Sequence, residues 1–446
     1  MDMVKNGFLG VLGCLMIVLL TMLNVRIVMA EDLLAVYQLA LENDPQLKKA
    51  YAKQNAIQEL DDQGIARLLP TVTASLSSSK AFLENTRQTF MGVGAQDYWE
   101  NSFRLNLKQP LLHYDYWVQL NQVNNQIAKA IADYELARQN TTLKVIEAYF
   151  KILSAQNNVQ FLNSEKQAIA LQLQRAKQKV KAGLGTITDI YEAQAIYDRT
   201  LSEEIAANNQ LADEHQTLIE IIGKRVTTIK VMTNSPELVS PKPLAIADWE
   251  KTADSHNLMI IALSNELEVA RKSVEIQQSG HLPQLDLIAS YSQEDANSRF
   301  GLRGETHAVG LQLNIPLYSG GMVSSKVRQA NFEYEAVREQ LETIRRAVQK
   351  QVNNAYRGVS TSISQAESLK TSIKSQETAL AATEVGFKAG TRTIVDVLLA
   401  ERNVHKAKRD YAQSLHDYII NRVKLKYAVS DISQQDLQQI NYWLTP

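Results

Sequence analysis

Cysteine is nearly absent from this chain of 446 residues, and its single cysteine, Cys14, lies close to the start. Disulfide bonds and thiol chemistry are therefore excluded for the rest of the protein. Further apolar residues follow Cys14, which argues against attachment of a lipid at this position. An excess of one charge is missing too, because 47 Lys and Arg stand against 48 Asp and Glu. This near-neutral balance gives no electrostatic reason to bind nucleic acid.

Motifs of catalysis are also missing. The chain has no Gly-rich phosphate loop that ends in Lys-Ser or Lys-Thr, no His-Glu-x-x-His motif and no Gly-x-Ser-x-Gly motif. Gly92-Val93-Gly94 falls in an expected loop between strands, so it does not predict a dinucleotide site. The seven histidines are scattered, and no two are spaced four residues apart. We therefore expect no enzyme activity, no metal and no cofactor.

The first 30 residues have the three parts of a secretory signal peptide. Lys5 supplies positive charge, residues 8–20 are nearly all apolar, and Ala30 precedes the expected cleavage site. An uncleaved anchor helix is the alternative, but Asn24 and Arg26 interrupt the apolar run before it reaches the roughly 20 residues of a membrane span. After residue 30 no stretch of 18 apolar residues exists, so a membrane-embedded part would have to be a closed β-barrel.

The chain contains an internal duplication. The tripeptide Lys181-Ala182-Gly183 recurs 207 positions later as Lys388-Ala389-Gly390. At the same offset, Thr186-Ile187-Thr188-Asp189-Ile190 matches Thr393-Ile394-Val395-Asp396-Val397. Several matches at one offset indicate two copies of one structural unit.

These matches divide the chain into five segments. The segment between the two copies carries three prolines, which suit an extended connection. The predicted organisation is a signal peptide (1–30), a first repeat (31–223), a linker (224–248), a second repeat (249–430) and a C-terminal tail (431–446).

Each repeat contains two short segments in which apolar and polar residues alternate, the pattern of a half-buried strand. The alternation puts Arg104 and Asp286 on polar faces, which favours a wet interior over the packed core of a β-sandwich. We expect Pro110 and Pro316 to close strands. Because a barrel needs about eight strands, copies must pool them, and two copies give eight while three give twelve. The predicted strands cover residues 71–76, 102–108, 284–291 and 309–315.

In each repeat a helix precedes the strands, a very long helix follows them, and a third helix returns from a turn at Gly183 or Gly390. From Ile127 to Val180, thirteen of sixteen positions at alternating three- and four-residue spacing are apolar, as in a coiled coil. The long helices would each span about 100 Å, which predicts a rod with strands at one end and hairpin tips at the other. The predicted helices are 32–66, 115–181, 188–222, 249–279, 323–387 and 394–428.

The stretch Gly390-Thr391-Arg392-Thr393-Ile394-Val395-Asp396-Val397-Leu398 resembles the TolC family of outer-membrane efflux and type I secretion channels, and the resemblance covers residues 31–432. It implies a mainly α-helical fold with a membrane β-barrel. Three chains would each give four strands to one twelve-stranded barrel, and their coiled-coil hairpins would form a tunnel in the periplasm. The implied contacts are outer-membrane lipid, a periplasmic adaptor (membrane fusion) protein and an inner-membrane transporter of the ABC or RND type.

The resemblance also implies roles for residues at the hairpin tips. In the family, aspartates narrow the tunnel entrance, and Asp396 matches one of their positions, whereas Leu399 stands where a second acidic residue is expected. A polar link between the two hairpins holds the tip shut. Arg392 matches the arginine of that link, and Thr188 and Asp189 match its partners.

Other readings of these tip residues stay open. Asp396 and Asp189 lie early in helices, where a carboxylate stabilises the positive end of the helix dipole. Arg392 could be a solvated charge, and Phe387 stands where relatives can carry a tyrosine, so any hydroxyl link there is lost. The turns expected to dock the adaptor are Lys181, Ala182, Gly183, Lys388, Ala389 and Gly390.

Taken together, these features predict a passive export duct for secreted proteins, toxic small molecules or both. A periplasmic coiled-coil adaptor or scaffold without a membrane barrel is the main alternative, and the signal peptide opposes a cytosolic coiled coil. An adaptor has no reason to carry apolar strand faces with aromatic residues near the strand ends. These aromatic residues are Tyr98, Trp99, Tyr114, Tyr116 and Trp117.

Overall fold

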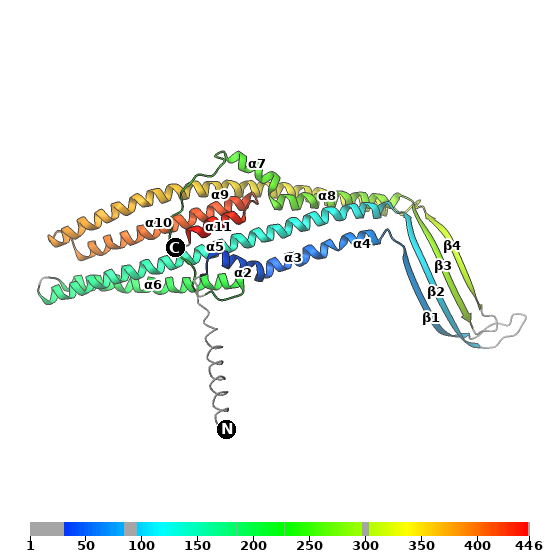
Figure 1. Ribbon diagram of the computed structural model, residues 1–446, viewed down its shortest axis with the longest axis horizontal. Coiled ribbons are helices and arrows are strands. Elements are labelled where there is room, and N and C mark those ends of the chain that lie inside the picture. Colours follow the sequence, from blue (N-terminus) through cyan, green and yellow to red (C-terminus); the bar gives the residue numbers. More distant parts are fainter. Residues whose placement is uncertain (1–30, 84–95, 184, 227, 297–302, 445–446) are drawn as a thin grey trace, which may run out of the picture.

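The computed structural model of the protein describes residues 31–83, 96–183, 185–226, 228–296 and 303–444. The predicted signal peptide, including Cys14, lies outside the described residues. The molecule is a rod in which long helices follow the axis, a four-stranded sheet stands at one end and two helical hairpins turn at the other (Figure 1). This arrangement confirms the predicted rod.

The sheet is antiparallel throughout, with the strand order β1-β2-β3-β4. Its strands are longer than the alternating segments of the sequence. The prediction that Pro110 closes its strand is wrong, because the second strand continues to Leu112 and its register with the third shifts between these two residues. A proline cannot donate a ladder hydrogen bond, so it lies at this irregularity. The strands are β1 (Thr71–Leu83), β2 (Gln96–Leu112), β3 (Gln284–Ala296) and β4 (Arg303–Asn314).

The register gathers the apolar side chains of all four strands on one face of the sheet. Leu105 lies opposite Ala74 on one side and Tyr291 on the other, and directly opposed residues share a face. Leu76 and Val309 are 83% and 79% exposed in the single chain, so no other described residues cover these two side chains of the face. The apolar face comprises Val72, Ala74, Leu76, Phe103, Leu105, Leu107, Leu285, Leu287, Ala289, Tyr291, Val309, Leu311 and Leu313.

The opposite face of the sheet is polar and carries ion pairs between β2 and β3. Lys108 Nζ lies 2.9 Å from Asp286 Oδ2. Asp286 is buried, and its other carboxylate oxygen lies 2.9 Å from Nε2 of the buried His113, the residue just before the first long helix. These contacts connect the base of the sheet to the start of that helix.

The two hairpins consist of α5 (Tyr114–Lys181) with α6 (Ile187–Ile222) and α9 (Met322–Lys388) with α10 (Ile394–Ala428). Their bounds agree with the predicted bounds to within one residue. At 1.5 Å per residue, the 68 residues of α5 span about 100 Å. None of the described helices has a segment that is both long and apolar enough to cross a bilayer. The predicted coiled-coil stripe is buried at Thr141, Val145, Ala148, Ile152, Ala155, Leu162, Ile169, Leu173 and Ala176.

The predicted continuous helices over 32–66 and 249–279 are each broken. In each repeat the first break follows a helix of 11 residues, at Asp44 in the first repeat and at Asn257 in the second. The Asp44 side chain accepts a hydrogen bond from the Gln46 N–H, and the Asn257 side chain accepts one from the Met259 N–H. Pro45 explains the first break, because it has no N–H and disfavours a helical residue before it. The observed elements are α2 (Leu33–Asn43), α3 (Pro45–Gln58), α4 (Leu60–Ala66), α7 (Ile246–His256), α8 (Leu258–Gln278) and the short turn η1 (Ser279–His281).

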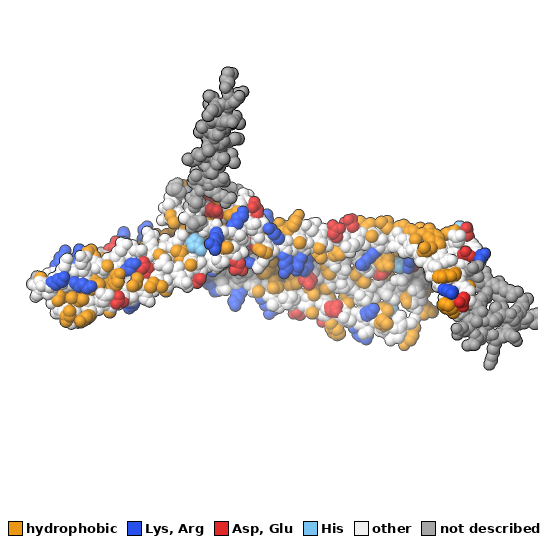
Figure 2. Space-filling view, turned by 90° about the horizontal axis from the view of Figure 1, so that it is seen from below, with side chains coloured by type: hydrophobic (Ala, Val, Ile, Leu, Met, Phe, Trp, Pro, Cys, Tyr) orange, Lys and Arg blue, Asp and Glu red, His pale blue; other side chains and the backbone are white. Residues whose placement is uncertain are grey.

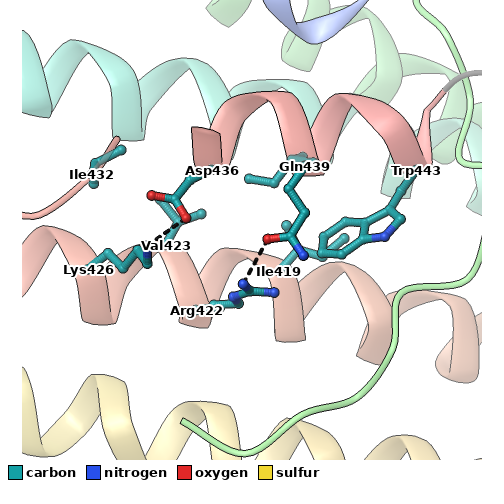
Figure 3. Close-up of a pocket in the computed structure, with 9 residues that line it drawn as sticks. Ile419, Arg422, Val423, Lys426, Ile432, Asp436, Gln439 and Trp443 are labelled. Atoms are coloured by element: carbon teal, nitrogen blue, oxygen red, sulfur yellow. Dashed lines mark hydrogen bonds and ion pairs between the residues drawn. The ribbon is translucent and has the colours of Figure 1, made fainter. Parts of the chain in front are cut away.

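Midway along the rod the two hairpins share an apolar core, in which Tyr149 and Tyr418 are fully buried. The C-terminal residues add α11 (Gln434–Trp443), which lies along α10 (Figure 3). Lys426 Nζ lies 2.6 Å from Asp436 Oδ1 and joins the two helices. The segment after residue 430 therefore contains a packed helix that completes this core.

Candidate functional site at the hairpin tips

Each hairpin turns through a glycine in the left-handed conformation. α5 ends at Lys181 and the chain turns at Gly183 (φ +73°), whereas α9 ends at Lys388 and the chain turns at Gly390 (φ +75°). Residues with a side chain rarely adopt this conformation, which explains the repeated glycine. The six turn residues predicted to dock an adaptor are all exposed, at the end of the rod far from the sheet (Figure 1). They are Lys181, Ala182, Gly183, Lys388, Ala389 and Gly390.

The returning helices begin with matching capping boxes. The Thr186 hydroxyl accepts a hydrogen bond from the Asp189 N–H (3.3 Å), and the Asp189 carboxylate accepts one from the Thr186 N–H (2.9 Å). Thr393 and Asp396 make the same two bonds, at 3.2 and 2.8 Å. Hydrogen bonds from the Thr393 backbone and hydroxyl hold the pKa of Asp396 below its ordinary value. Both aspartates therefore cap their helices.

Asp396 and Leu399 lie on a side of α10 that is at least partly exposed in the described part of the chain. Val397 and Leu398, which lie between them in the sequence, are 1% and 0% exposed, so the other side of the helix packs inside the hairpins. Leu399 is 47% exposed, and Asp396 is partly exposed. Residues three apart lie on one helix face, so the helix presents a carboxylate and a leucine together.

Arg392 and Asp189 line one cavity between the two hairpins. Among the described side chains no ion pair joins them, because the Asp189 carboxylate bonds to the cap of its own helix and Arg392 lies against Gly386. A Cβ added to Gly386 would come within 2.8 Å of the Arg392 Cγ. Thr188 is exposed in the first turn of α6. The single chain thus brings Arg392 and Asp189 to one cavity without pairing them.

A cation–π contact joins the two hairpins at the same cavity. Lys179 Nζ on α5 lies 4.0 Å from the centroid of the Phe387 ring on α9. Contacts of this kind contribute about 0.5–1 kcal/mol at exposed sites. Sequence reasoning misses the contact, since it singles out Phe387 only for the hydroxyl that it lacks, and the two residues lie in different repeats.

A second charged group joins the hairpins farther from the tips. Arg402 on α10 lies 3.1 Å (Nη2) from Glu203 Oε1 on α6 and 3.4 Å (Nε) from Glu165 Oε1 on α5. Burial raises the pKa of Glu165, whose side chain is 7% exposed, and Arg402 opposes that rise. Nearby, the Gln172 amide donates a hydrogen bond to Glu401 (3.2 Å) across the same helix pair. Arg402 therefore connects three helices through carboxylates on two of them.

The family of the chain follows from comparison with known proteins. A family model described as "Outer membrane efflux protein" matches residues 36–224 and 251–430, more than half of the chain. The chain belongs to the outer membrane efflux protein family.

Relatives of this efflux protein extend over nearly the whole chain. The outer membrane protein TolC of Vibrio cholerae is 32% identical and covers 93% of this chain and 94% of its own length. The proteases secretion protein PrtF of Dickeya chrysanthemi is 27% identical, with 93% and 91% covered. The structure of the CmeC outer membrane channel of Campylobacter jejuni superposes with a TM-score of 0.80 at 18% identity, with 93% and 90% covered. This last similarity is one of fold.

The family confirms the main predictions from the sequence. This efflux protein is an export channel of the outer membrane, and its helical part lies in the periplasm. Its fold is mainly helical, with the long hairpins of a tunnel joined to the strands of a barrel. Its family comprises channel and transport proteins, so the alternative of an adaptor or scaffold without membrane strands is not favoured.

Proposed function

We propose that three copies of this chain form one duct from the periplasm to the outside of the cell. The observation that carries the proposal is the sheet, which has one apolar face and, in the described chain, two unpaired edges at β1 and β4. The two edge strands run in opposite directions, so β4 of one copy can pair antiparallel with β1 of the next. Twelve strands from three copies suffice for a barrel with a water-filled opening.

The duct is passive in this proposal, and an energised partner drives the transport. The cargo in this proposal is secreted proteins, toxic small molecules or both. A proteases secretion protein among the relatives supports secreted proteins, and the match to an efflux protein family supports small molecules. The energised partner is an inner-membrane transporter of the ABC or RND type, joined to the channel by a periplasmic adaptor at the exposed hairpin turns. Affinity capture after crosslinking in cells should recover all three proteins together. Recovery of the channel without any inner-membrane protein would contradict this assignment.

A gate is proposed at Asp396 and Leu399. In a trimer their shared face would present three carboxylates, with three leucines one turn away. A carboxylate ring favours cations, whereas a leucine ring narrows and dries an opening. In the single chain the hydrogen bonds from Thr393 lower the pKa of Asp396 and so favour its charged form, whereas the two other carboxylates of a ring would oppose this effect.

Single-channel current in planar bilayers tests the gate, with a trivalent cation added on the tip side. The wild-type channel should be blocked, Asp396→Asn should abolish the block, and Leu399→Asp should strengthen it. Asp198→Asn removes an exposed acid farther along α6 and should leave the block unchanged. If the block survives Asp396→Asn, Asp396 does not face the pore and only caps its helix.

A lock between the hairpins is proposed for Arg392, Asp189 and Thr188, beside the contact between Lys179 and Phe387. Arg392→Ser or Asp189→Asn should raise the conductance of the purified channel, and the double variant should add little, because both changes break one link. Phe387→Leu removes the cation–π contact while keeping an apolar side chain beside the buried cluster, and it should raise the conductance less. Additive effects, or no effect of Arg392→Ser, would favour a solvated arginine.

A further inference from the structure

Two carboxyl groups lie where α5 packs against α10, in the half of the rod that ends at the hairpin tips. The side chain of Glu165 on α5 is 7% exposed, and Glu401 on α10 is partly buried. Glu165 contacts Arg402, whereas Glu401 accepts its hydrogen bond from Gln172, two turns beyond Glu165 on α5. Other charged side chains of both signs lie on the outside of this half of the rod in Figure 2. Glu165 and Glu401 are called the carboxyl pair below.

Each member of the carboxyl pair has one buried oxygen without a hydrogen-bond donor. Among the described residues, neither Glu165 Oε1 nor Glu401 Oε2 accepts a hydrogen bond. Arg402 Nε lies 3.4 Å from Glu165 Oε1 but lacks hydrogen-bond geometry. A charged carboxylate at this contact has lost water without full replacement, whereas a protonated carboxyl group carries no charge to solvate. The packed hairpins therefore favour the protonated form.

The charges around the carboxyl pair do not reverse this preference. Burial is the largest influence, and it raises the pKa of both groups. Arg402 opposes the rise at one member and the Gln172 amide opposes it at the other, but Arg402 also contacts Glu203 at 3.1 Å. Repulsion from Glu203 and Glu384 reinforces the rise. The charged or titratable groups around the pair are Arg402, His405, Lys408 and Arg409 on α10, Arg199, Glu203 and Glu204 on α6, Lys166 and Arg175 on α5, and Glu384 on α9.

We propose that the carboxyl pair is a pH-sensitive switch between the hairpins, which favours their packing when both groups are protonated and their separation when both are charged. Separation exposes the groups to water, where each has its ordinary pKa of about 4.5. Because the pKa is higher in the packed state, the added stability is complete below that value and is lost as the pH rises through the raised pKa. An acidic periplasm therefore favours packed hairpins, and a neutral one eases their opening.

Hydrogen–deuterium exchange of the purified full-length channel tests the switch. The double variant Glu165→Gln with Glu401→Gln carries amides of similar shape that stay neutral at every pH. At pH 7.5, amides around these two positions should exchange at least about fivefold more slowly in the double variant than in the wild-type protein. At pH 4.5 the two proteins should differ by less than about twofold. Both proteins retain His416, whose protonation acts in the opposite direction, so the comparison at one pH isolates the carboxyl pair.

The matched control is Glu377→Gln. Glu377 on α9 lies 2.8 Å from Lys408 on α10, and its side chain is 48% exposed. This variant removes an exposed carboxylate that also joins two helices, so it should change exchange by less than about twofold at either pH. Exchange in the double variant that equals or exceeds that of the wild-type protein at pH 7.5 would overturn the inference. A slowing of the same size at pH 4.5, or in Glu377→Gln, would overturn it as well.

Single-channel current separates the switch from the proposed duct. The switch lies within one chain, so it goes beyond the duct and does not depend on the number of copies. In Arg392→Ser, adding Glu165→Gln and Glu401→Gln should lower the conductance at pH 7.5, because the hairpins then stay packed. An unchanged conductance would show that the carboxyl pair does not control opening. A preparation without conductance in any of these variants would contradict the duct, and the exchange data would still decide the switch.

Discussion

Replacing Arg402 by methionine removes the cation that joins the two hairpins while keeping a long apolar stem. Glu203 keeps a partner in this variant, because Arg199 Nε lies 3.0 Å from its carboxylate within α6. Glu165 does not, since Arg402 is the cation in contact with it and its side chain is 7% exposed. The variant therefore leaves one nearly buried carboxylate without its contacting cation.

The expected cost follows from the geometry of the group. Removal of one partner from a fully buried ion pair costs about 3–5 kcal/mol. Here Arg402 is 27% exposed, and its 3.4 Å contact to Glu165 lacks hydrogen-bond geometry. Glu165 can also take up a proton, because burial raises its pKa. We therefore expect the free energy of local opening of the hairpins to fall by about 2 kcal/mol in Arg402→Met.

Hydrogen–deuterium exchange of the intact channel measures this quantity. A loss of 2 kcal/mol corresponds to about 30-fold faster exchange of protected amides around Glu165 on α5 and Arg402 on α10. Arg199→Met is the matched control, because Arg199 is 60% exposed and contacts the same Glu203. Loss of such an exposed pair costs about 0.3–0.5 kcal/mol, or about twofold in exchange.

Two results would refute this reasoning. Equal exchange in Arg402→Met and Arg199→Met would show that the depth of Glu165 does not matter. The second test adds Glu165→Leu to Arg402→Met, which removes the unpaired carboxylate together with its cation. The loss of opening free energy in this double variant should be smaller than the sum of the losses in the two single variants. Strict additivity of these losses would show that the two residues do not interact.

Other perturbations test the core and the sheet. His416 is 1% exposed, and burial lowers its pKa from 6.5 to about 4. The opened state binds the proton first, so the free energy of opening of α10 should fall by about 3 kcal/mol as the pH drops from 6.5 to 4. In His416→Phe, hydrogen exchange should no longer show this fall in the opening free energy of α10. The same dependence on pH in the variant and the wild-type protein would contradict the assignment to His416. Leu105→Arg and Leu311→Arg, on the apolar face of the sheet, should each cost about 2–4 kcal/mol and reduce the oligomer recovered from outer membranes. Asn106→Arg, on the polar face, should leave the recovery of the oligomer unchanged. Equal recovery of the oligomer from all three variants would refute the assignment of the faces.

The parts of the fold that local signals determine could be predicted from the sequence. α10 begins and ends where predicted. In the sequence, the glycine turn at Gly390 precedes its start, and Asp396 lies early in the helix, where a carboxylate is favoured. The turns at Gly183 and Gly390 were equally predictable, since a positive φ selects glycine.

Contacts between the repeats were not predictable in this way. Lys179 contacts Phe387, and Arg402 contacts Glu165, because the two hairpins pack side by side. No local sequence pattern indicates which residues of the two hairpins lie opposite each other. A continuous helix was also the wrong prediction at Asp44, because that prediction left out the effect of Pro45, which disfavours a helical conformation of the residue before it. The candidate site was therefore located by its turns and caps, whereas the contacts that hold its two halves together required the structure.

The number of chains per particle tests the central claim most directly. Four strands cannot close a barrel, whereas both eight strands from two copies and twelve from three copies could. The mass of the protein in detergent, corrected for bound detergent and lipid, should correspond to three chains. A mass of one or two chains in particles that still conduct in bilayers would contradict the account.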